Sequence, residues 1–166
     1  MKTIKVDKVT LNIGTGEPGE KLDKAVKLLG SITNEKPAQT VSNKRIPTWG
    51  VRPGLVIGCK VTVRKEKAIV LLARLLKAVN NNISERKFDK FGNVSFGVKE
   101  YIEIPGAKYD PSIGIIGLDV AVTLKRAGYR IKERAMKKSH IGKKHMITRE
   151  EAMKFMNEKF GVEVTN

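Results

Sequence analysis

Residues 14–19, "GTGEPG", have the G-x-G-x-x-G spacing that binds the pyrophosphate of dinucleotides where a strand turns into a helix. The local context fits, because an alternating segment precedes the turn and a helical pattern follows it. The charges do not fit, since Glu17 and Glu20 would put carboxylates where a pyrophosphate must meet helix N–H groups. We therefore prefer a plain glycine-rich turn. A nucleotide-dependent enzyme stays as an alternative, which titration with NAD or ATP would detect.

Other side chains that could do chemistry are isolated. His140 and His145 lie in a cationic tract that holds no thiol and would repel a divalent metal ion. Cys59 stands alone, so neither a disulfide nor a cysteine zinc cluster is expected, and no nucleophile motif surrounds it. The sequence predicts no enzyme, no metal site and no cofactor.

The positive charge is concentrated in two segments. The chain of 166 residues has a formal net charge of +16. Residues 36–67 hold eight Lys or Arg against Glu66 alone, and residues 125–149 hold ten against Glu133 alone, while the remainder is balanced. Such blocks favour a polyanionic partner, because neutralised phosphates release counterions. A basic surface that serves solubility alone is the alternative. A membrane partner is not expected, because neither segment has an apolar face and the longest apolar run is residues 68–73.

Trp49, the single tryptophan, lies among cations in the segment 42–56. Lys44, Arg45 and Arg52 flank it, and proline and glycine residues exclude a helix or a regular strand. A flexible loop of this kind can follow a phosphate backbone while the ring stacks on a base or ribose. The alternative is a ring that folds back over the core.

Hydrophobic periodicity supplies the elements that must position these residues. Alternation predicts strands over Ile4–Ile13, Ile57–Arg64, Val94–Ile104 and Ile116–Leu124. Helical spacing predicts helices from Leu22 to a stop at Gly30, over Ala68–Val79, and over 148–161, where Thr148 and Glu151 match a capping box.

These elements predict an α+β fold: a mostly antiparallel sheet, helices packed on one face, a protruding basic loop and a basic C-terminal arm. We expect one domain over 1–166, with a core over 1–125, the loop at 42–56, an extended arm at 126–147 and the final helix at 148–161. The N-terminal residues lack the apolar centre of a signal peptide, so we expect a cytoplasmic protein.

Five ordered motifs resemble the L-five family of large-subunit ribosomal proteins, which binds 5S rRNA. They are "KVTLNIGTGE", "EKPAQT", "IPTWGVRPGLVIGCKVTVR", "FDKFGNVSFGVKEYIEIPGAKYDP" and "GIIGLDVAVTLKRAGYR". The segment after Arg130 resembles the archaeal and eukaryotic branch of that family. A free-standing RNA-binding protein or chaperone is the alternative, and sedimentation with large subunits would separate the two.

The resemblance implies a structural protein that attaches 5S rRNA in the central protuberance. Its 5S rRNA contacts would be Asn12, Lys36, Lys60, Thr62 and Arg64. The family often has Gln where this chain has Glu35, and a carboxylate is unfavourable beside phosphates. The loop with Lys44, Arg45, Trp49 and Arg52 would approach the peptidyl-site tRNA. The arm would contact large-subunit rRNA through Arg126, Arg130, Lys132, Arg134, Lys137, Lys138, Lys143 and Lys144. Implied protein partners are L-eighteen in the protuberance and S-thirteen of the small subunit.

Overall fold

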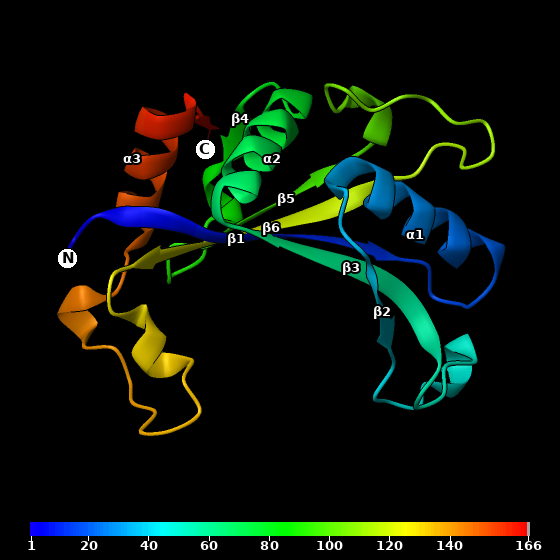
Figure 1. Cartoon of the computed structure of the whole chain (residues 1–166), viewed down its shortest axis with the longest axis horizontal. Coiled ribbons are helices and arrows are strands. Elements are labelled where there is room, and N and C mark those ends of the chain that lie inside the picture. The colour runs from blue at the N-terminus through cyan, green and yellow to red at the C-terminus, as the bar shows by residue number, and fades with distance from the viewer. Residues whose placement is uncertain (166) are drawn as a thin grey trace. The chain divides into compact units, whose positions relative to one another are not determined.

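The computed structural model describes residues 1–165, which form an α+β fold (Figure 1). The strands are β1 (Ile4–Gly14), β2 (Ala38–Val41), β3 (Val56–Arg64), β4 (Asn82–Ser84), β5 (Val94–Val98), β6 (Leu118–Arg126) and β7 (Glu163–Thr165). The α-helices are α1 (Glu20–Thr33), α2 (Lys65–Ala78) and α3 (Arg149–Phe160). The expected fold class is confirmed.

The main sheet is mostly antiparallel and has the strand order β2-β3-β1-β6-β5. In the antiparallel pair of β2 and β3, Ala38 lies opposite Lys60 and Thr40 opposite Gly58. Strands β1 and β2 do not pair with each other across α1, because β3 lies between them. A second, small sheet pairs β4 with β7 in parallel, with Ile83 opposite Val164. The sequence did not predict β2, β4 or β7.

Backbone contacts divide the chain into two compact units. Unit 1 comprises 1–9, 64–96 and 121–166, and unit 2 comprises 10–63 and 97–120. Strands β1, β5 and β6 contribute residues to both units, and β3 contributes its last residue, Arg64, to unit 1.

In unit 2, α1 packs its apolar stripe on the strands. Its buried side chains are Leu22, Ala25, Leu28, Leu29 and Ile32. The strands contribute alternate residues, which is the pattern of a sheet that is covered on one face; these are Leu11, Ile13, Cys59, Val61, Val63, Val98, Leu118 and Val120. The predicted end of α1 at Gly30 is wrong. The helix continues to Thr33, and Asn34 supplies the left-handed residue (φ 54°) whose N–H donates to the Gly30 carbonyl.

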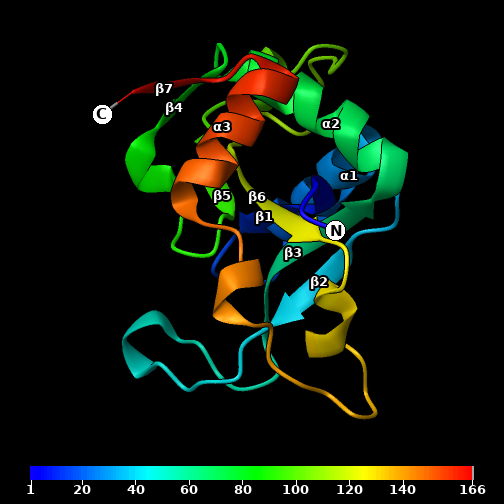
Figure 2. The same cartoon turned by 90° about the vertical axis from the view of Figure 1, so that its left-hand side faces the viewer.

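In unit 1, α2 and α3 lie on one side of the strands (Figure 2). Helix α2 buries Ala68, Leu71, Leu72, Leu75, Leu76 and Ala78. Helix α3 buries Ala152 and Met156, and the predicted capping box is confirmed: the Glu151 N–H donates to Thr148 Oγ1, and the Thr148 N–H donates to the Glu151 carboxylate. Gly161, at φ 65°, ends the helix.

The predicted strand over Val94–Ile104 is only half correct. Strand β5 ends at Val98, and Tyr101–Glu103 form a short 3-10 helix. Tyr101 and Ile104, three residues apart, are buried, whereas Ile102 is 39% exposed. The turn is fixed because the Tyr101 N–H donates to the Ile116 carbonyl, and Tyr101 Oη accepts from the Asp110 N–H. The buried residues are therefore three apart here, as in a 3-10 helix, and not two apart, as in the predicted strand.

Candidate nucleic-acid interface

The sheet face opposite α1 in unit 2 is polar. Thr10 and Asn12 of β1, and Lys60 and Thr62 of β3, alternate with the buried residues of their strands. Thr10 Oγ1 and Thr62 Oγ1 are 3.4 Å apart, and the Thr15 N–H donates to the Ile57 carbonyl. These two contacts fix the antiparallel register, which puts Asn12 opposite Lys60. Three of the expected 5S rRNA contacts are thus on one face.

The other two expected 5S rRNA contacts are exposed cations that flank these strands in the sequence. Arg64 is exposed at the end of β3, two residues beyond Thr62, and belongs to unit 1. Lys36 is exposed just before β2, whose Ala38 lies opposite Lys60. Glu35, beside it, is half-buried.

A groove of about 770 Å³ opens in unit 2 at the end of β1. Asn12, Lys24 and Lys99 line it together with the exposed Asp119 of β6. Sequence reasoning did not single out Lys24 or Lys99 as possible contacts, because they come from a helix and a loop distant in the chain. The groove brings amide, ammonium and carboxylate groups together, which suits hydrogen bonding to ribose and phosphate rather than acid–base catalysis.

The glycine-rich turn has the geometry of a connection. Gly19 precedes α1 at φ 133°, and the first turn of α1 carries the carboxylates of Glu20 and Asp23. Those acids already interact with the positive end of the helix, where a pyrophosphate would have to lie. The dinucleotide interpretation therefore has no support from this turn.

The loop 42–56 is hydrogen-bonded rather than flexible. Ile46 and Val51 exchange N–H···O=C bonds of 2.9 and 3.1 Å around the short 3-10 helix Pro47–Trp49. At the base of the loop, the Ser42 N–H donates to the Leu55 carbonyl. Trp49 is 76% exposed, which excludes the alternative of a ring folded over the core.

The same loop exposes three cations besides that ring. Lys44, Arg45 and Arg52 are exposed, whereas Val51 is buried and anchors the loop. In Figure 1 the loop projects beyond β2 and β3, on the side away from α1. The loop thus presents a flat apolar ring and three positive charges from a backbone with its own hydrogen bonds.

The arm 126–147 is folded back on itself, so the expectation of an extended arm is wrong. Short 3-10 helices form at Tyr129–Lys132 and Lys143–His145. The Ser139 N–H donates to the Ile131 carbonyl, and a ring nitrogen of His145 lies 2.9 Å from the Ala127 carbonyl oxygen. Seven of the predicted cations are exposed: Arg130, Lys132, Arg134, Lys137, Lys138, Lys143 and Lys144.

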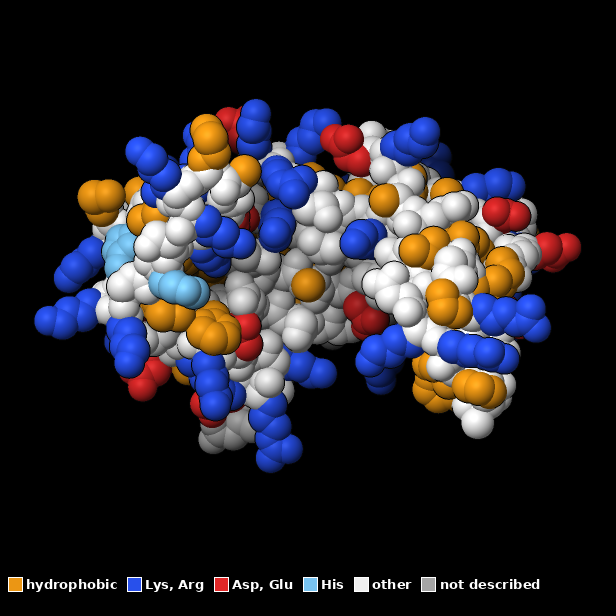
Figure 3. All heavy atoms as spheres, turned by 90° about the horizontal axis from the view of Figure 1, so that it is seen from below, with side chains coloured by type: hydrophobic (Ala, Val, Ile, Leu, Met, Phe, Trp, Pro, Cys, Tyr) orange, Lys and Arg blue, Asp and Glu red, His pale blue; other side chains and the backbone are white. Residues whose placement is uncertain are grey.

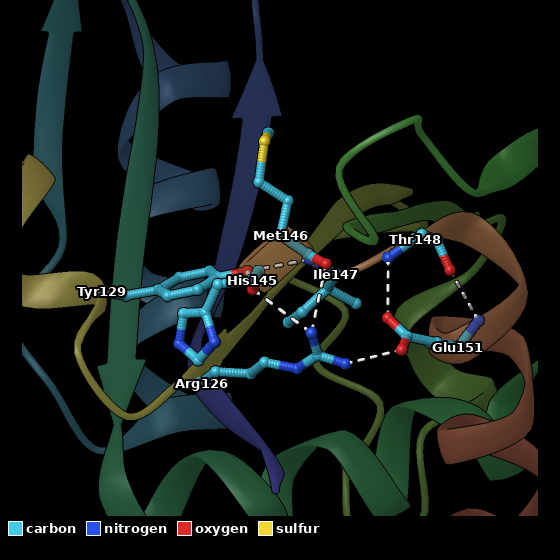
Figure 4. A network of polar contacts seen from close by, with 7 residues as sticks. All are labelled: Arg126, Tyr129, His145, Met146, Ile147, Thr148 and Glu151. Carbon is cyan, nitrogen blue, oxygen red and sulfur yellow. Dashed lines mark hydrogen bonds and ion pairs between the residues drawn. The ribbon is translucent and has the colours of Figure 1, made fainter. Parts of the chain in front are cut away.

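Arg126 is the exception, and its assignment as an RNA-contacting cation needs correction. It is only 6% exposed, and its Nη1 donates to the carbonyls of His145 and Met146, each at 3.2 Å. Its Nη2 donates to Glu151 at 2.7 Å (Figure 4). Arg126 therefore ties β6 to the end of the arm and to α3. Its position in β6 could have revealed this, because it continues the buried even-numbered residues 118–124.

Tyr129 belongs to the same hydrogen-bond network. Its hydroxyl accepts from the Ile147 N–H at 2.9 Å and donates to the His145 carbonyl at 3.2 Å. Its ring packs edge-on against His145, with centroids 5.8 Å apart. His145 thus has a structural position, whereas His140 is exposed.

The described residues contain no cluster of three or more His, Cys, Asp or Glu side chains that could hold a metal ion. Cys59 is buried, and its burial raises the pKa of the thiol, which disfavours the thiolate nucleophile. Through residue 165, no helix is long and apolar enough to cross a membrane. Figure 3 shows many Lys and Arg side chains in the view from below, together with several acidic ones.

Comparisons with known proteins agree with this chemistry. The family described as "Ribosomal protein L5" matches residues 1–52, and the C-terminal part of the same ribosomal family matches residues 56–155. The chain is 48% identical to the large ribosomal subunit protein uL5 of Sulfolobus acidocaldarius over 164 residues, which cover 99% of this chain and 92% of that protein. It is 49% identical to uL5 of Nanoarchaeum equitans over 165 residues, which cover 99% and 97%.

The chain belongs to the ribosomal protein L5 family. It is a structural constituent of the large ribosomal subunit and not an enzyme. The resemblance seen in the five motifs is confirmed, and similarity at this level to archaeal uL5 proteins agrees with the branch indicated by the C-terminal segment. As an L5 protein it is located in the ribosome, in association with rRNA.

Proposed function

We propose that this L5 protein attaches 5S rRNA in the central protuberance of a cytoplasmic large subunit. The sheet face of unit 2 that carries Asn12, Lys60 and Thr62 would be the docking surface, and Lys36 would extend it. Arg64 of unit 1 would be a further contact. The observation that carries the proposal is the register of β1 and β3, which puts an amide, an ammonium and a hydroxyl on one uncovered face.

The chemistry of this face suits folded RNA. Amide and hydroxyl groups can hydrogen-bond to ribose hydroxyls and base edges, and lysine can pair with phosphate. Strands hold these groups at fixed spacings, so they recognise a shape, whereas exposed cations contribute affinity that depends on salt. The groove lined by Asn12, Lys24 and Lys99 would continue the surface.

The loop 42–56 would approach the peptidyl-site tRNA. Support comes from the 76% exposure of Trp49 between Lys44, Arg45 and Arg52, and from the hydrogen bonds that hold the loop. A preordered ring and three charges fit a nucleic acid backbone with little loss of conformational entropy.

The arm would contact large-subunit rRNA through its seven exposed cations, without Arg126. Contacts with ribosomal protein L-eighteen and with small-subunit protein S-thirteen complete the proposed assembly. They follow from the resemblance to L-five proteins alone.

The decisive measurement is the affinity for 5S rRNA as a function of salt. The logarithm of the binding constant should fall linearly with the logarithm of the salt concentration. Each of about six phosphate contacts should add just under one to the slope, which would then be several units. Lys60→Ala should weaken binding and lower the slope by about one. Asn12→Ala should weaken binding at an unchanged slope.

Lys27→Ala is the matched control, because Lys27 is an exposed lysine of the same unit that lies on α1. It should leave both affinity and slope as in the wild type. Equal binding by all three variants would refute the docking surface. Co-sedimentation with large subunits at moderate salt would test assembly into the ribosome independently of this docking surface.

A further inference from the structure

The turn 89–93 presents an aromatic ring to solvent from a rigid backbone. Asp89 Oδ1 accepts from the N–H groups of Phe91 (2.8 Å) and Asn93 (2.7 Å), and its Oδ2 accepts from Asn93 Nδ2 (2.7 Å). Gly92, at φ +76°, packs so closely on Ile147 that a Cβ there would lie 2.5 Å from Ile147 Cγ2. Phe91 nevertheless remains 59% exposed. The Asp89 bonds and the packing of Gly92 hold the backbone of the turn that carries this exposed ring.

Phe91 stands at the edge of a pocket in unit 1. The pocket has a volume of about 390 Å³, within the range of small-ligand sites. Leu124, Tyr129 and Ile147 give it an apolar lining, and Lys132 and His140 of the arm contribute the polar groups. Lys132 Nζ lies 4.9 Å from the centroid of the Tyr129 ring, so it is held at the wall of the pocket.

The charge around this pocket selects the class of occupant. Residues 125–149 carry ten Lys or Arg and the single acid Glu133, and Lys90 is exposed next to Phe91. An apolar pocket inside such a cationic surface fits a group that is flat and apolar on its faces and joined to a negative charge. An unstacked nucleotide has that chemistry.

We propose that this pocket takes one unstacked RNA base, which stacks on Phe91 while Lys132 pairs with the adjoining phosphate. His140 lies where it can hydrogen-bond to the edge of the base or to the phosphate. The site shares no residue with the sheet face of unit 2. With this pocket, the arm would bind an unpaired base of rRNA as well as attract its phosphates. This inference rests on the association of the protein with RNA.

The test uses the full chain and a fluorescein-labelled single-stranded RNA octamer of mixed sequence, with its blunt duplex as a second probe. Anisotropy titrations at several salt concentrations compare the wild type with Phe91→Trp, Phe91→Leu, Phe91→Ala and Lys132→Gln. Val70→Ala is the matched control, because Val70 is a 64% exposed apolar residue of the same unit on α2. Circular dichroism verifies that each variant is folded.

Stacking requires a flat ring. Phe91→Trp should bind the octamer as tightly as the wild type, while Phe91→Leu and Phe91→Ala should bind it about 5- to 150-fold more weakly at an unchanged salt slope. Lys132→Gln should weaken binding and lower the slope by about one. The duplex should bind all Phe91 variants equally, because its bases are already stacked.

Three results would overturn the pocket assignment. Phe91→Leu could bind like the wild type while Phe91→Ala does not, which would indicate the apolar contact typical of a protein partner. All Phe91 variants could bind like the wild type. The wild type could also bind 5S rRNA and not the octamer, which would refute the pocket and leave the proposed docking of 5S rRNA intact.

Discussion

Arg126 Nη2 and Glu151 Oε1 lie 2.7 Å apart, so the last residue of β6 is joined to the first turn of α3. Arg126 is 6% exposed, whereas the Glu151 side chain is 42% exposed. The pair lies at the edge of the unit 1 core, where it holds the two ends of the arm to the strand and the helix. A strongly basic segment is thereby fixed by one of its own cations.

Arg126→Met should destabilise the protein by about 2–3 kcal/mol. The substitution removes donors from two carbonyls and one carboxylate, and a hydrogen bond to a charged group is worth about 1.5–3 kcal/mol. Urea unfolding of the whole chain, followed by circular dichroism, measures the loss. Arg130→Met, at an exposed position of the same arm, should stay within about 0.5 kcal/mol of the wild type. Equal effects at the two positions would contradict a structural role for Arg126.

Glu151 should make part of the stability depend on pH. The Thr148 N–H and the Arg126 guanidinium hold the pKa of its carboxyl below the ordinary value. A carboxyl with a lowered folded pKa contributes stability that is complete above its unfolded pKa, about 4.3, and is lost as the pH falls through the folded pKa. The difference in unfolding free energy between wild type and Glu151→Gln should thus be constant near neutrality and shrink below about pH 4. A difference that stays constant throughout acid unfolding would contradict the assignment.

Trp49 should report on assembly as the only tryptophan of the chain. Because its ring is 76% exposed, acrylamide should quench its fluorescence in the free protein almost as efficiently as that of indole in water. In the large subunit the proposed contact with tRNA should protect it when the peptidyl site is filled. Trp49→Ala should leave the unfolding free energy unchanged within about 0.5 kcal/mol. Weak quenching in the free protein would show that the ring is buried.

Gly58→Ala should destabilise unit 2. Its Cβ would lie 2.6 Å from the backbone carbonyl oxygen of Ile13, a group that cannot rotate away, and overpacking of this kind typically costs about 1–3 kcal/mol. Gly14→Ala is the control, since a Cβ there meets nothing within 4 Å. Thermal unfolding of the two variants compares them directly. A stable Gly58→Ala protein would mean that β1 and β3 can separate at this point.

Alternation located β1, β3 and β6 because each strand has one covered face and one polar face, so burial follows every second residue. It missed β2 because three of its four residues, Ala38, Gln39 and Val41, are exposed at the edge of the sheet. Strands β4 and β7 have three residues each, too few for a period to be recognised.

The residues of the candidate sites were likewise only partly predictable from the sequence. The resemblance to L-five proteins indicated Asn12, Lys60 and Thr62, and alternation put each of them on the polar face of its own strand. The pocket beside Phe91 could not be predicted, since its lining joins segments more than 50 residues apart. The signal that could have indicated the exposed ring was local: Asp89, Gly92 and Asn93 are typical turn residues around an aromatic one.

The division of unit 1 among three separate segments has a consequence for how the protein is made. All residues of unit 2 have been synthesised once the chain reaches residue 120, whereas unit 1 still needs α3 and the fully buried Val162. Because compact units fold as their residues emerge during translation, the surface proposed to receive 5S rRNA would mature first. The nascent chain would then hold a nearly finished docking face while unit 1 still lacks α3 and Val162.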